Sequence, residues 1–268
     1  MSTVTAARPI RQLALALAGL LLAVPALAGC DMNSLLGKKP GDCTLYQTKP
    51  KSGKSTPLLL VLLDLQDNSA PTGQQVATAL KPYLDDALAQ GSYVKLIASG
   101  GTSAGTKTFS CFSGDTPYLV KRNNSNRQDK DRTSGSEALQ TQVTDDVQET
   151  PISQVGSVTS LLGGIPDDVQ SLKSTPGVDI SDVTVLVWSD LLGNGGEQDC
   201  MNVENKQASV QVAEAVVSRC FAAQQISPVK DAKIRFIGVS QGNLTPPQQN
   251  LSRYLRGELC RRLSSDCS

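Results

Sequence analysis

Apolar and polar positions change in blocks along the chain, and the blocks predict strands that alternate with helices. Runs of consecutive apolar residues, as at 58–63 and 183–188, are typical of strands buried on both faces of a sheet. Apolar residues at helical spacing lie between Val76 and Leu88, where Pro82 is expected to kink or break the helix. Further strands are predicted at 93–98, 106–112 and 234–239, and further helices at 137–148, 158–172, 208–221 and 246–263.

Local signals refine three of these predictions. Gly163, Gly164 and Pro166 are expected to interrupt the helix at 158–172. The polar stretch 113–134 has no periodicity and predicts a loop, in which the basic residues of 121–132 alternate with acids and asparagines. The last helix has a clear start, because Thr245, Pro246 and Gln248 fit a cap, a first helical position and a capping box.

Alternating strands and helices predict the fold class. Apolar strands separated by helices are typical of an α/β protein with a single doubly wound, mostly parallel sheet and helices on both faces. The 268 residues show no internal repeat and no second hydrophobic core. We therefore expect one domain over residues 57–268.

The N-terminus predicts export. Arg8 and Arg11 precede an apolar run at 13–28, which is typical of a secretion signal. The run ends in Leu27-Ala28-Gly29-Cys30, which resembles the lipobox of bacterial lipoproteins. That resemblance implies cleavage after residue 29 and acylation of Cys30, and acyl chains then hold the protein on a membrane. Residues 1–29 are thus expected to be a signal peptide, and residues 30–56 a lipidated cysteine with a polar tether.

Localisation follows from the same motif. A lipid-anchored protein of this kind lies on the periplasmic or extracytoplasmic side of the cell membrane, and Asp31 resembles an inner-membrane retention signal. The competing interpretation is an ordinary cleavage site with a free cysteine nearby. Asp31 is the only feature of the sequence that bears on the choice between inner and outer membrane.

Charge and composition exclude several classes of function. Loss of Arg8 and Arg11 leaves 23 basic against 25 acidic residues, a net charge of −2 and no concentrated basic region, so no nucleic-acid partner is expected. The chain contains no histidine, which rules out a Ser-His-Asp triad, a Cys-His dyad and histidine-ligated zinc or copper. Any metal must therefore be held by oxygens, which favours a hard cation such as Mg²⁺.

Cysteines predict disulfide bonds. An even number remains after Cys30, as expected for disulfides in an exported protein, and none has the Cys-x-x-Cys spacing of a zinc site. The short spacings favour the pairs Cys200–Cys220 and Cys260–Cys267, but the sequence does not decide among the possible pairings. The candidates are Cys43, Cys111, Cys200, Cys220, Cys260 and Cys267.

Two glycine-containing segments resemble phosphate-binding loops without meeting their requirements. Gly53-Lys54-Ser55-Thr56 has the ending of a P-loop, but it precedes a strand, and Thr48 stands where the first glycine belongs. Gly100-Gly101 follows a strand, but an extended segment rather than a helix comes after it. No nucleotide is expected to bind.

Polar residues at the ends of the predicted strands carry a family resemblance. Asp64 ends the first strand, Ser189-Asp190 follows the strand at 183–188, and Ile237-Gly238-Val239 closes the last strand. Together these segments resemble the von Willebrand factor A-type domain over residues 57–264. In that family, an Asp-x-Ser-x-Ser motif, a threonine and a second aspartate form a metal-ion-dependent adhesion site.

The resemblance implies a degenerate Mg²⁺ site. Asp64 and Asp190 occupy the two aspartate positions, and Ser157 replaces the threonine. Gln66 and Asn68 stand where the motif has serines; amide oxygens bind hard cations, but these side chains are bulkier. The competing interpretation is that Asp64 and Asp190 are solvated or helix-capping residues at strand ends.

Three functions remain open at this stage. The first is a membrane-anchored lipoprotein of the cell envelope that binds a protein partner, in adhesion or scaffolding, without enzymatic activity. The second is a metal-free structural subunit of an envelope secretion or conjugation apparatus. The third is a metal-dependent hydrolase that uses Asp64, Asp67 and Asp190.

Overall fold

The computed structural model describes residues 55–65, 72–99, 107–112, 125–150, 158–174, 179–239 and 244–268. All of them belong to one compact unit, Lys39–Ser268. Its strands are β1 (Ser55–Asp64), β2 (Tyr93–Ser99), β3 (Lys107–Phe112), β4 (Asp179–Trp188), β5 (Ala232–Phe236) and β6 (Asp266–Cys267). Its helices are α2 (Gly73–Gln90), α4 (Ser125–Glu149), α5 (Val158–Lys173), α6 (Val210–Ala222) and α7 (Pro246–Leu263).

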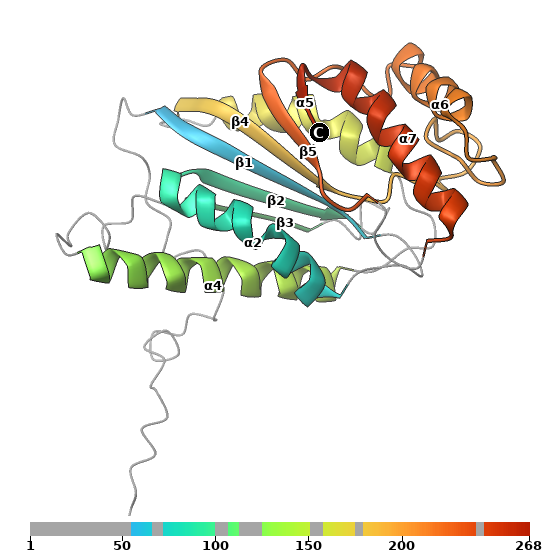
Figure 1. The fold of residues 1–268 in the computed structure, drawn as a ribbon. Coiled ribbons are helices and arrows are strands. Elements are labelled where there is room, and N and C mark those ends of the chain that lie inside the picture. The colour runs from blue at the N-terminus through green and yellow to red at the C-terminus, as the bar shows by residue number, and fades with distance from the viewer. Residues whose placement is uncertain are drawn as a thin grey trace, which may run out of the picture. The chain divides into compact units, whose positions relative to one another are not determined.

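The six strands form one sheet in the order β3-β2-β1-β4-β5-β6 (Figure 1). Neighbouring strands are parallel except β3, which is antiparallel to β2. The first described strand, β1, lies in the middle of the sheet; β2 and β3 extend the sheet on one side of β1, and β4, β5 and β6 extend it on the other. The predicted doubly wound, mostly parallel α/β fold is confirmed, and strand order reverses between β1 and β4.

Two hydrophobic cores cover the two faces of the sheet. Because strand side chains alternate between faces, Leu58, Leu60 and Leu62 of β1 contact one core, and Leu59, Val61 and Leu63 contact the other. The first core contains α5, α6 and α7, and the second contains α2 and α4 (Figure 1). Each core is closed by helices of the same unit, so Lys39–Ser268 has the buried interior of an independently folding domain.

Two expected helix breaks do not occur. α2 continues through Pro82, and α5 continues through Gly163, Gly164 and Pro166. A proline removes one hydrogen bond from the helix, but each helix buries an apolar stripe against the sheet, which outweighs that local cost. Propensity alone gave the wrong result here because tertiary packing overrides it.

Other differences lie at element ends. Residues 125–134 were expected in a loop but form the first turns of α4. They carry no apolar stripe, so the sequence pattern gave no sign of a helix there. The helix continues into this polar segment from its buried part, which lies further along the chain. β6 was not expected from the sequence. It is held by the Arg235–Asp266 ion pair of 2.6 Å and by backbone bonds between Ser268 and β5.

Gly163 shows why α5 tolerates a glycine in its interior. A Cβ at this position would lie 2.3 Å from the backbone oxygen of Gln225, so the helix can approach the segment after α6 only without a side chain there. Gly257 in α7 is the matched contrast, because a Cβ there would meet nothing within 4 Å.

We expect Gly163→Ala to lower the free energy of unfolding by about 1–3 kcal/mol, since the backbone must move to relieve the clash. Gly257→Ala is expected to raise it by up to about 1 kcal/mol, because alanine is the better helix former. Urea denaturation of both variants measures the difference. Equal effects of the two substitutions would contradict the close approach at Gly163.

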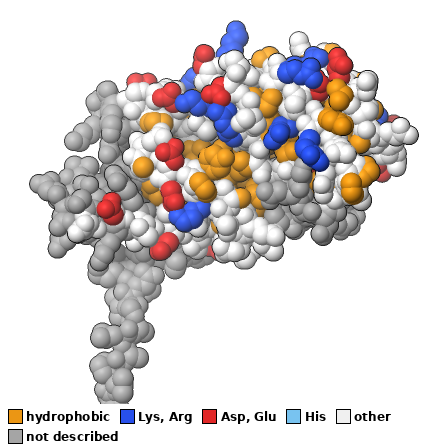
Figure 2. Space-filling model, viewed as in Figure 1, with side chains coloured by type: hydrophobic (Ala, Val, Ile, Leu, Met, Phe, Trp, Pro, Cys, Tyr) orange, Lys and Arg blue, Asp and Glu red, His pale blue; other side chains and the backbone are white. Residues whose placement is uncertain are grey.

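The surface of the domain is mixed in character. Figure 2 shows hydrophobic side chains on one face interspersed with charged ones. Among the described residues, the large hydrophobic side chains exposed to solvent are Val210 and Tyr254. No described helix is long and apolar enough to cross a bilayer.

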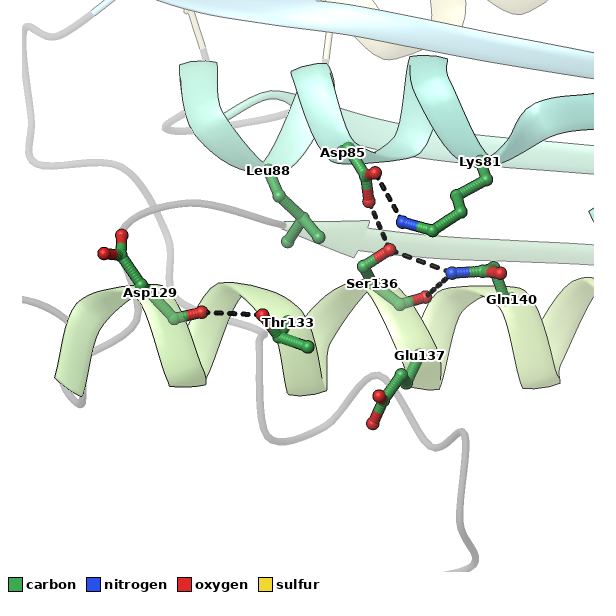
Figure 3. A pocket seen from close by; sticks show the side chains of 8 residues that line it. All are labelled: Lys81, Asp85, Leu88, Asp129, Thr133, Ser136, Glu137 and Gln140. Carbon is green, nitrogen blue, oxygen red and sulfur yellow. Dashed lines mark hydrogen bonds and ion pairs between the residues drawn. The ribbon is translucent and has the colours of Figure 1, made fainter. Parts of the chain in front are cut away.

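A polar groove of about 370 Å³ lies between α2 and α4 (Figure 3). At its centre Asp85 accepts a hydrogen bond from Ser136 of α4 and is paired with Lys81 at 2.6 Å. Partial burial raises the pKa of Asp85, but the hydrogen bonds from Lys81 and Ser136 and the charge of Lys81 together hold it below its usual value of 3.8.

This pKa predicts an acid-dependent contribution to stability. A carboxyl group with a lowered pKa in the folded state stabilises the fold above pH 3.8 and loses that effect as the pH falls through the lower, folded-state value. The pair is half-exposed, so solvent screening limits the effect to less than about 1 kcal/mol. Asp85→Asn should therefore be slightly less stable than the unmodified chain at pH 7 and equal to it near pH 2. A difference that grows on acidification would contradict this assignment.

Candidate functional site

Asp64 and Asp190 lie at the ends of adjacent strands. β1 and β4 are paired in parallel with Leu63 opposite Trp188, so Asp64 and Ser189-Asp190 leave the sheet together at its carboxyl edge. This is also the point where strand order reverses, which is where open α/β sheets bind their ligands. The structure thus brings together the two acidic residues that the sequence singled out.

Ser189 connects the two strand ends. Its hydroxyl donates to Oδ2 of Asp64 at 2.7 Å and accepts the backbone N–H of Leu191 at 2.9 Å. Both partners are buried, with Asp64 6% and Ser189 1% exposed. The sequence analysis did not assign Ser189 a role, although its place between a buried strand and Asp190 was a signal.

Asp190 is held from two sides. Its Oδ1 accepts the N–H of Leu192 at 2.9 Å, and its backbone carbonyl accepts a hydrogen bond from Ser252, a fully buried residue of α7. Leu191 between them has a φ of +63°, an unfavourable conformation for a bulky residue. Such strain persists only where the surroundings enforce it, as the Ser189 and Asp190 bonds do here.

The end of β5 closes against the same turn. A Cβ at Gly238 would lie 2.5 Å from the backbone nitrogen of Ser189, so only glycine permits this approach. The N–H of Ile237 donates to the carbonyl of Val187 at 2.9 Å, which continues the pairing of β5 with β4. The turn that carries Asp190 is therefore fixed by β1, β5 and α7.

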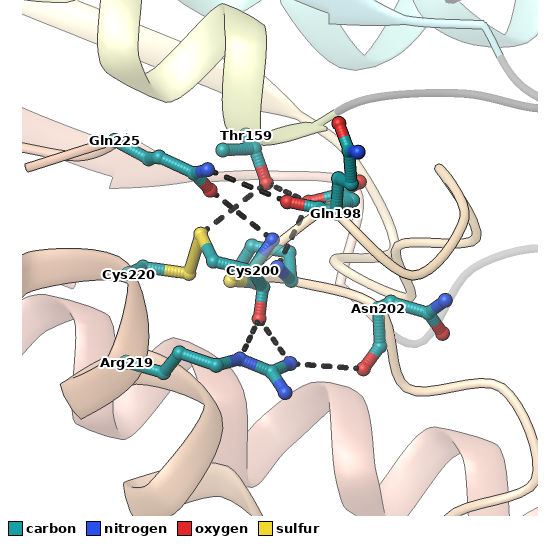
Figure 4. The surroundings of a disulfide bond; sticks show 9 residues. Thr159, Gln198, Cys200, Asn202, Arg219, Cys220 and Gln225 are labelled. Atoms are coloured by element: carbon teal, nitrogen blue, oxygen red, sulfur yellow. Dashed lines mark hydrogen bonds between the residues drawn. A yellow bond between two sulfur atoms is a disulfide. The ribbon is translucent and has the colours of Figure 1, made fainter. Parts of the chain in front are cut away.

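The segment between β4 and α6 is fixed by a second set of contacts (Figure 4). The predicted disulfide Cys200–Cys220 is present and ties this segment to α6. Arg219 donates to the backbone oxygen of Cys200 at 2.6 Å. Asp199 accepts a hydrogen bond from Thr159, at the start of α5, and the N–H of Met201 at 2.8 Å.

The other predicted disulfide, Cys260–Cys267, joins α7 to β6. Both short-range pairings are thus confirmed. Cys30 and Cys43 lie outside the described residues, and the same holds for the pairing of Cys111. The predictions of lipid attachment at Cys30 and of a third disulfide therefore remain predictions.

The residues at the carboxyl edge fit a hard cation in their donor chemistry. Asp64, Ser189 and Asp190 supply carboxylate and hydroxyl oxygens, which Mg²⁺ prefers. Within the described part of the chain, however, no three His, Cys, Asp or Glu side chains come close enough to form a metal cluster. Gln66, Asn68 and Ser157 lie outside the described residues.

Comparisons with known proteins do not assign a family. No family model matches the chain, and no curated protein sequence matches it. Among solved structures, it is similar to the pilus adhesin SpaC from Lactobacillus rhamnosus GG, with 10% identity and a TM-score of 0.39. The match covers 81% of this chain but only 29% of the adhesin. A similarity of this size carries no conclusion about function.

Proposed function

We propose that the chain is a membrane-anchored cell-envelope lipoprotein whose domain binds a protein partner through the carboxyl edge of its sheet. The observation that carries this proposal is the convergence of Asp64, Ser189 and Asp190 at the switch point between β1 and β4. The lipobox-like sequence ending in Cys30 supports the anchor, and the absence of histidine from the sequence supports a binding role over a catalytic one.

In the first form of this function, the edge binds its partner with the help of Mg²⁺. Asp64 and Asp190 would hold the ion, together with Gln66, Asn68 and Ser157 as the resemblance to A-type domains implies. The bound ion would supply a positive charge that attracts a carboxylate of the partner. The rigid turn at 189–192 would keep Asp190 in place as the partner binds.

A metal-free form is the second candidate, as in a structural subunit of an envelope apparatus. It is favoured by the bonds that Asp64 and Asp190 already make, because each accepts hydrogen bonds from the neighbouring turn. In this form the two carboxylates shape the binding edge without holding an ion.

Affinity capture distinguishes the two forms. Immobilised Lys39–Ser268 would be incubated with envelope extract, with and without a chelator, beside the Asp190→Asn variant and an Asp86→Asn control on α2. Retention of a partner that is lost with Asp190→Asn, but not with Asp86→Asn, supports the binding edge. If the unmodified domain also loses the partner when the chelator is present, the result supports the Mg²⁺ form. If the chelator does not change retention, the result supports the metal-free form. Retention that ignores Asp190→Asn would contradict both.

A further inference from the structure

The outward surface of α7 is basic. The helix contains Arg253, Arg256, Arg261 and Arg262 and a single acid, Glu258. Glu258 is only 2% exposed and is paired with Arg261, whereas Arg253, Arg261 and Arg262 are exposed. Figure 2 shows Lys and Arg side chains among hydrophobic ones over the region where Figure 1 places α7. The solvent side of this helix therefore carries positive charge without an exposed acid of its own.

The arginine side chains of α7 make hydrogen bonds within the domain that use only a few of their guanidinium N–H groups. Arg253 bonds to Gln249 and Asn250 of its own helix. Arg262 donates to Ser218 of α6 at 2.8 Å and lies over the ring of Phe221. A guanidinium has five N–H donors, so these bonds orient the side chains and leave donors for an anion.

Tyr254 and Gly257 lie on the same side of the helix. Tyr254 is 37% exposed, and a Cβ at Gly257 would meet nothing within 4 Å. Glycine inside a helix costs about 1 kcal/mol relative to alanine, and no internal contact requires it here. Positions three and four residues apart are neighbours on a helix surface. Gly257, which has no side chain, therefore leaves a shallow depression on the helix surface between Arg253, Tyr254 and Arg261.

We propose that this arginine face, formed by Arg253, Tyr254, Arg256, Gly257 and Arg261, binds the anionic headgroups of a lipid bilayer. The proposal rests on the proposed function, since the anchor at Cys30 would keep the domain at a membrane. Basic residues near an anionic bilayer strengthen its binding, and an exposed tyrosine suits the interface between headgroups and water.

The position of α7 in the fold agrees with this orientation. Its last residues lie at the beginning of β5, because Leu263 accepts the N–H of Val229 at 2.7 Å. β1 begins at the same edge of the parallel sheet, so the predicted tether joins the domain there. The 24 residues 31–54 between Cys30 and β1 span at most about 80 Å, which keeps this edge within reach of the bilayer.

An acidic protein would be the other occupant for a basic surface. The centre of a protein interface is normally apolar, with arginine enriched beside aromatic residues. The arginine face has a single exposed aromatic residue, Tyr254, and charge dominates it. These features favour lipid headgroups over a protein.

Vesicle co-sedimentation tests the proposal. Lys39–Ser268 lacks Cys30, so its binding does not involve the predicted lipid anchor. It still contains Lys39, Lys49, Lys51 and Lys54 before β1, so the comparison with the arginine variant isolates the share of the arginine face. We expect it to bind vesicles that contain 30% phosphatidylglycerol, to ignore pure phosphatidylcholine vesicles, and to dissociate in high salt. Each basic residue contributes about a five-fold gain near an anionic surface, so Arg253→Gln combined with Arg256→Gln should weaken binding about 25-fold. Replacing Arg253 and Arg256 leaves the buried Glu258 paired with Arg261.

The control variant combines Lys81→Gln with Lys173→Gln, which removes the same charge from α2 and α5 and is expected to bind as the unmodified domain does. Equal weakening by both double variants, or no binding to anionic vesicles, would overturn the proposal. If the domain binds polyglutamate through these arginines but does not bind vesicles, the proposal is also overturned, and an acidic protein becomes the occupant of this face. None of these results bears on Asp64 and Asp190, so failure here leaves the proposed function standing.

Discussion

Replacing Ser189 by alanine is expected to lower the free energy of unfolding by about 3 kcal/mol. Ser189 is 1% exposed, and its hydroxyl makes two buried bonds, to the carboxylate of Asp64 and to the N–H of Leu191. A hydrogen bond to a charged group contributes about 1.5–3 kcal/mol, and a buried N–H left without an acceptor costs about 1–3 kcal/mol. Leu191 also loses the contact that holds its strained backbone conformation.

Urea denaturation of Lys39–Ser268 measures this effect. Ser181→Ala is the matched control, because Ser181 also belongs to the β4 region but is exposed, and surface substitutions usually change stability by less than about 0.5 kcal/mol. If Ser189→Ala shifts the midpoint no further than Ser181→Ala does, the link between the ends of β1 and β4 is not a significant part of the fold.

Removal of the Cys200–Cys220 disulfide is expected to have an effect of similar size. The bond closes a separation of 20 residues, for which the chain-entropy estimate is about 3 kcal/mol. Both cysteines are buried in the core that contains α5, α6 and α7, so alanine at both positions also loses packing. The bond fixes the segment whose first residues are Ser189 and Asp190, so the partner binding that we propose at the carboxyl edge should weaken as well.

The Cys260–Cys267 bond provides the comparison. It closes a separation of only 7 residues, for which the same estimate is about 2 kcal/mol. It ties α7 to β6, away from the turn at 189–192. Double alanine variants of each pair, compared by thermal denaturation, should therefore rank with Cys200–Cys220 as the more costly loss. The reverse ranking would contradict the role given to the segment between β4 and α6.

The central strands were predictable because burial on both faces leaves a continuous apolar run. The pattern at 58–63 and 183–188 located β1 and β4, and parallel pairing then brought Asp64 and Asp190 to one edge. α2 and α5 were located by their apolar stripes, but their continuity through Pro82 and Pro166 depends on packing that no local signal reports. β6 escaped prediction for the same reason, since two residues become a strand only beside β5.

The sequence predicted the two aspartates of the candidate site but not the hydrogen bonds that hold them in place. Ser189 and Ser252 act through partners 125 and 62 residues away in sequence, and only the fold shows those contacts. The Asp199–Thr159 bond likewise joins the segment between β4 and α6 to the start of α5, a proximity that the sequence does not encode locally. The candidate residues Asp64 and Asp190 were thus easier to single out than the residues that position them.

The proposed binding edge is tested most directly by site-specific photocross-linking of the full chain in cells of its source organism. A photoreactive residue would replace Leu192, beside Asp190 at the carboxyl edge, or Gln90, at the end of α2 on the opposite edge. The proposal predicts a specific protein adduct from position 192, its loss when Asp64→Ala is added, and no adduct from position 90. Adducts from position 90 alone, or adducts from position 192 that persist with Asp64→Ala, would contradict it.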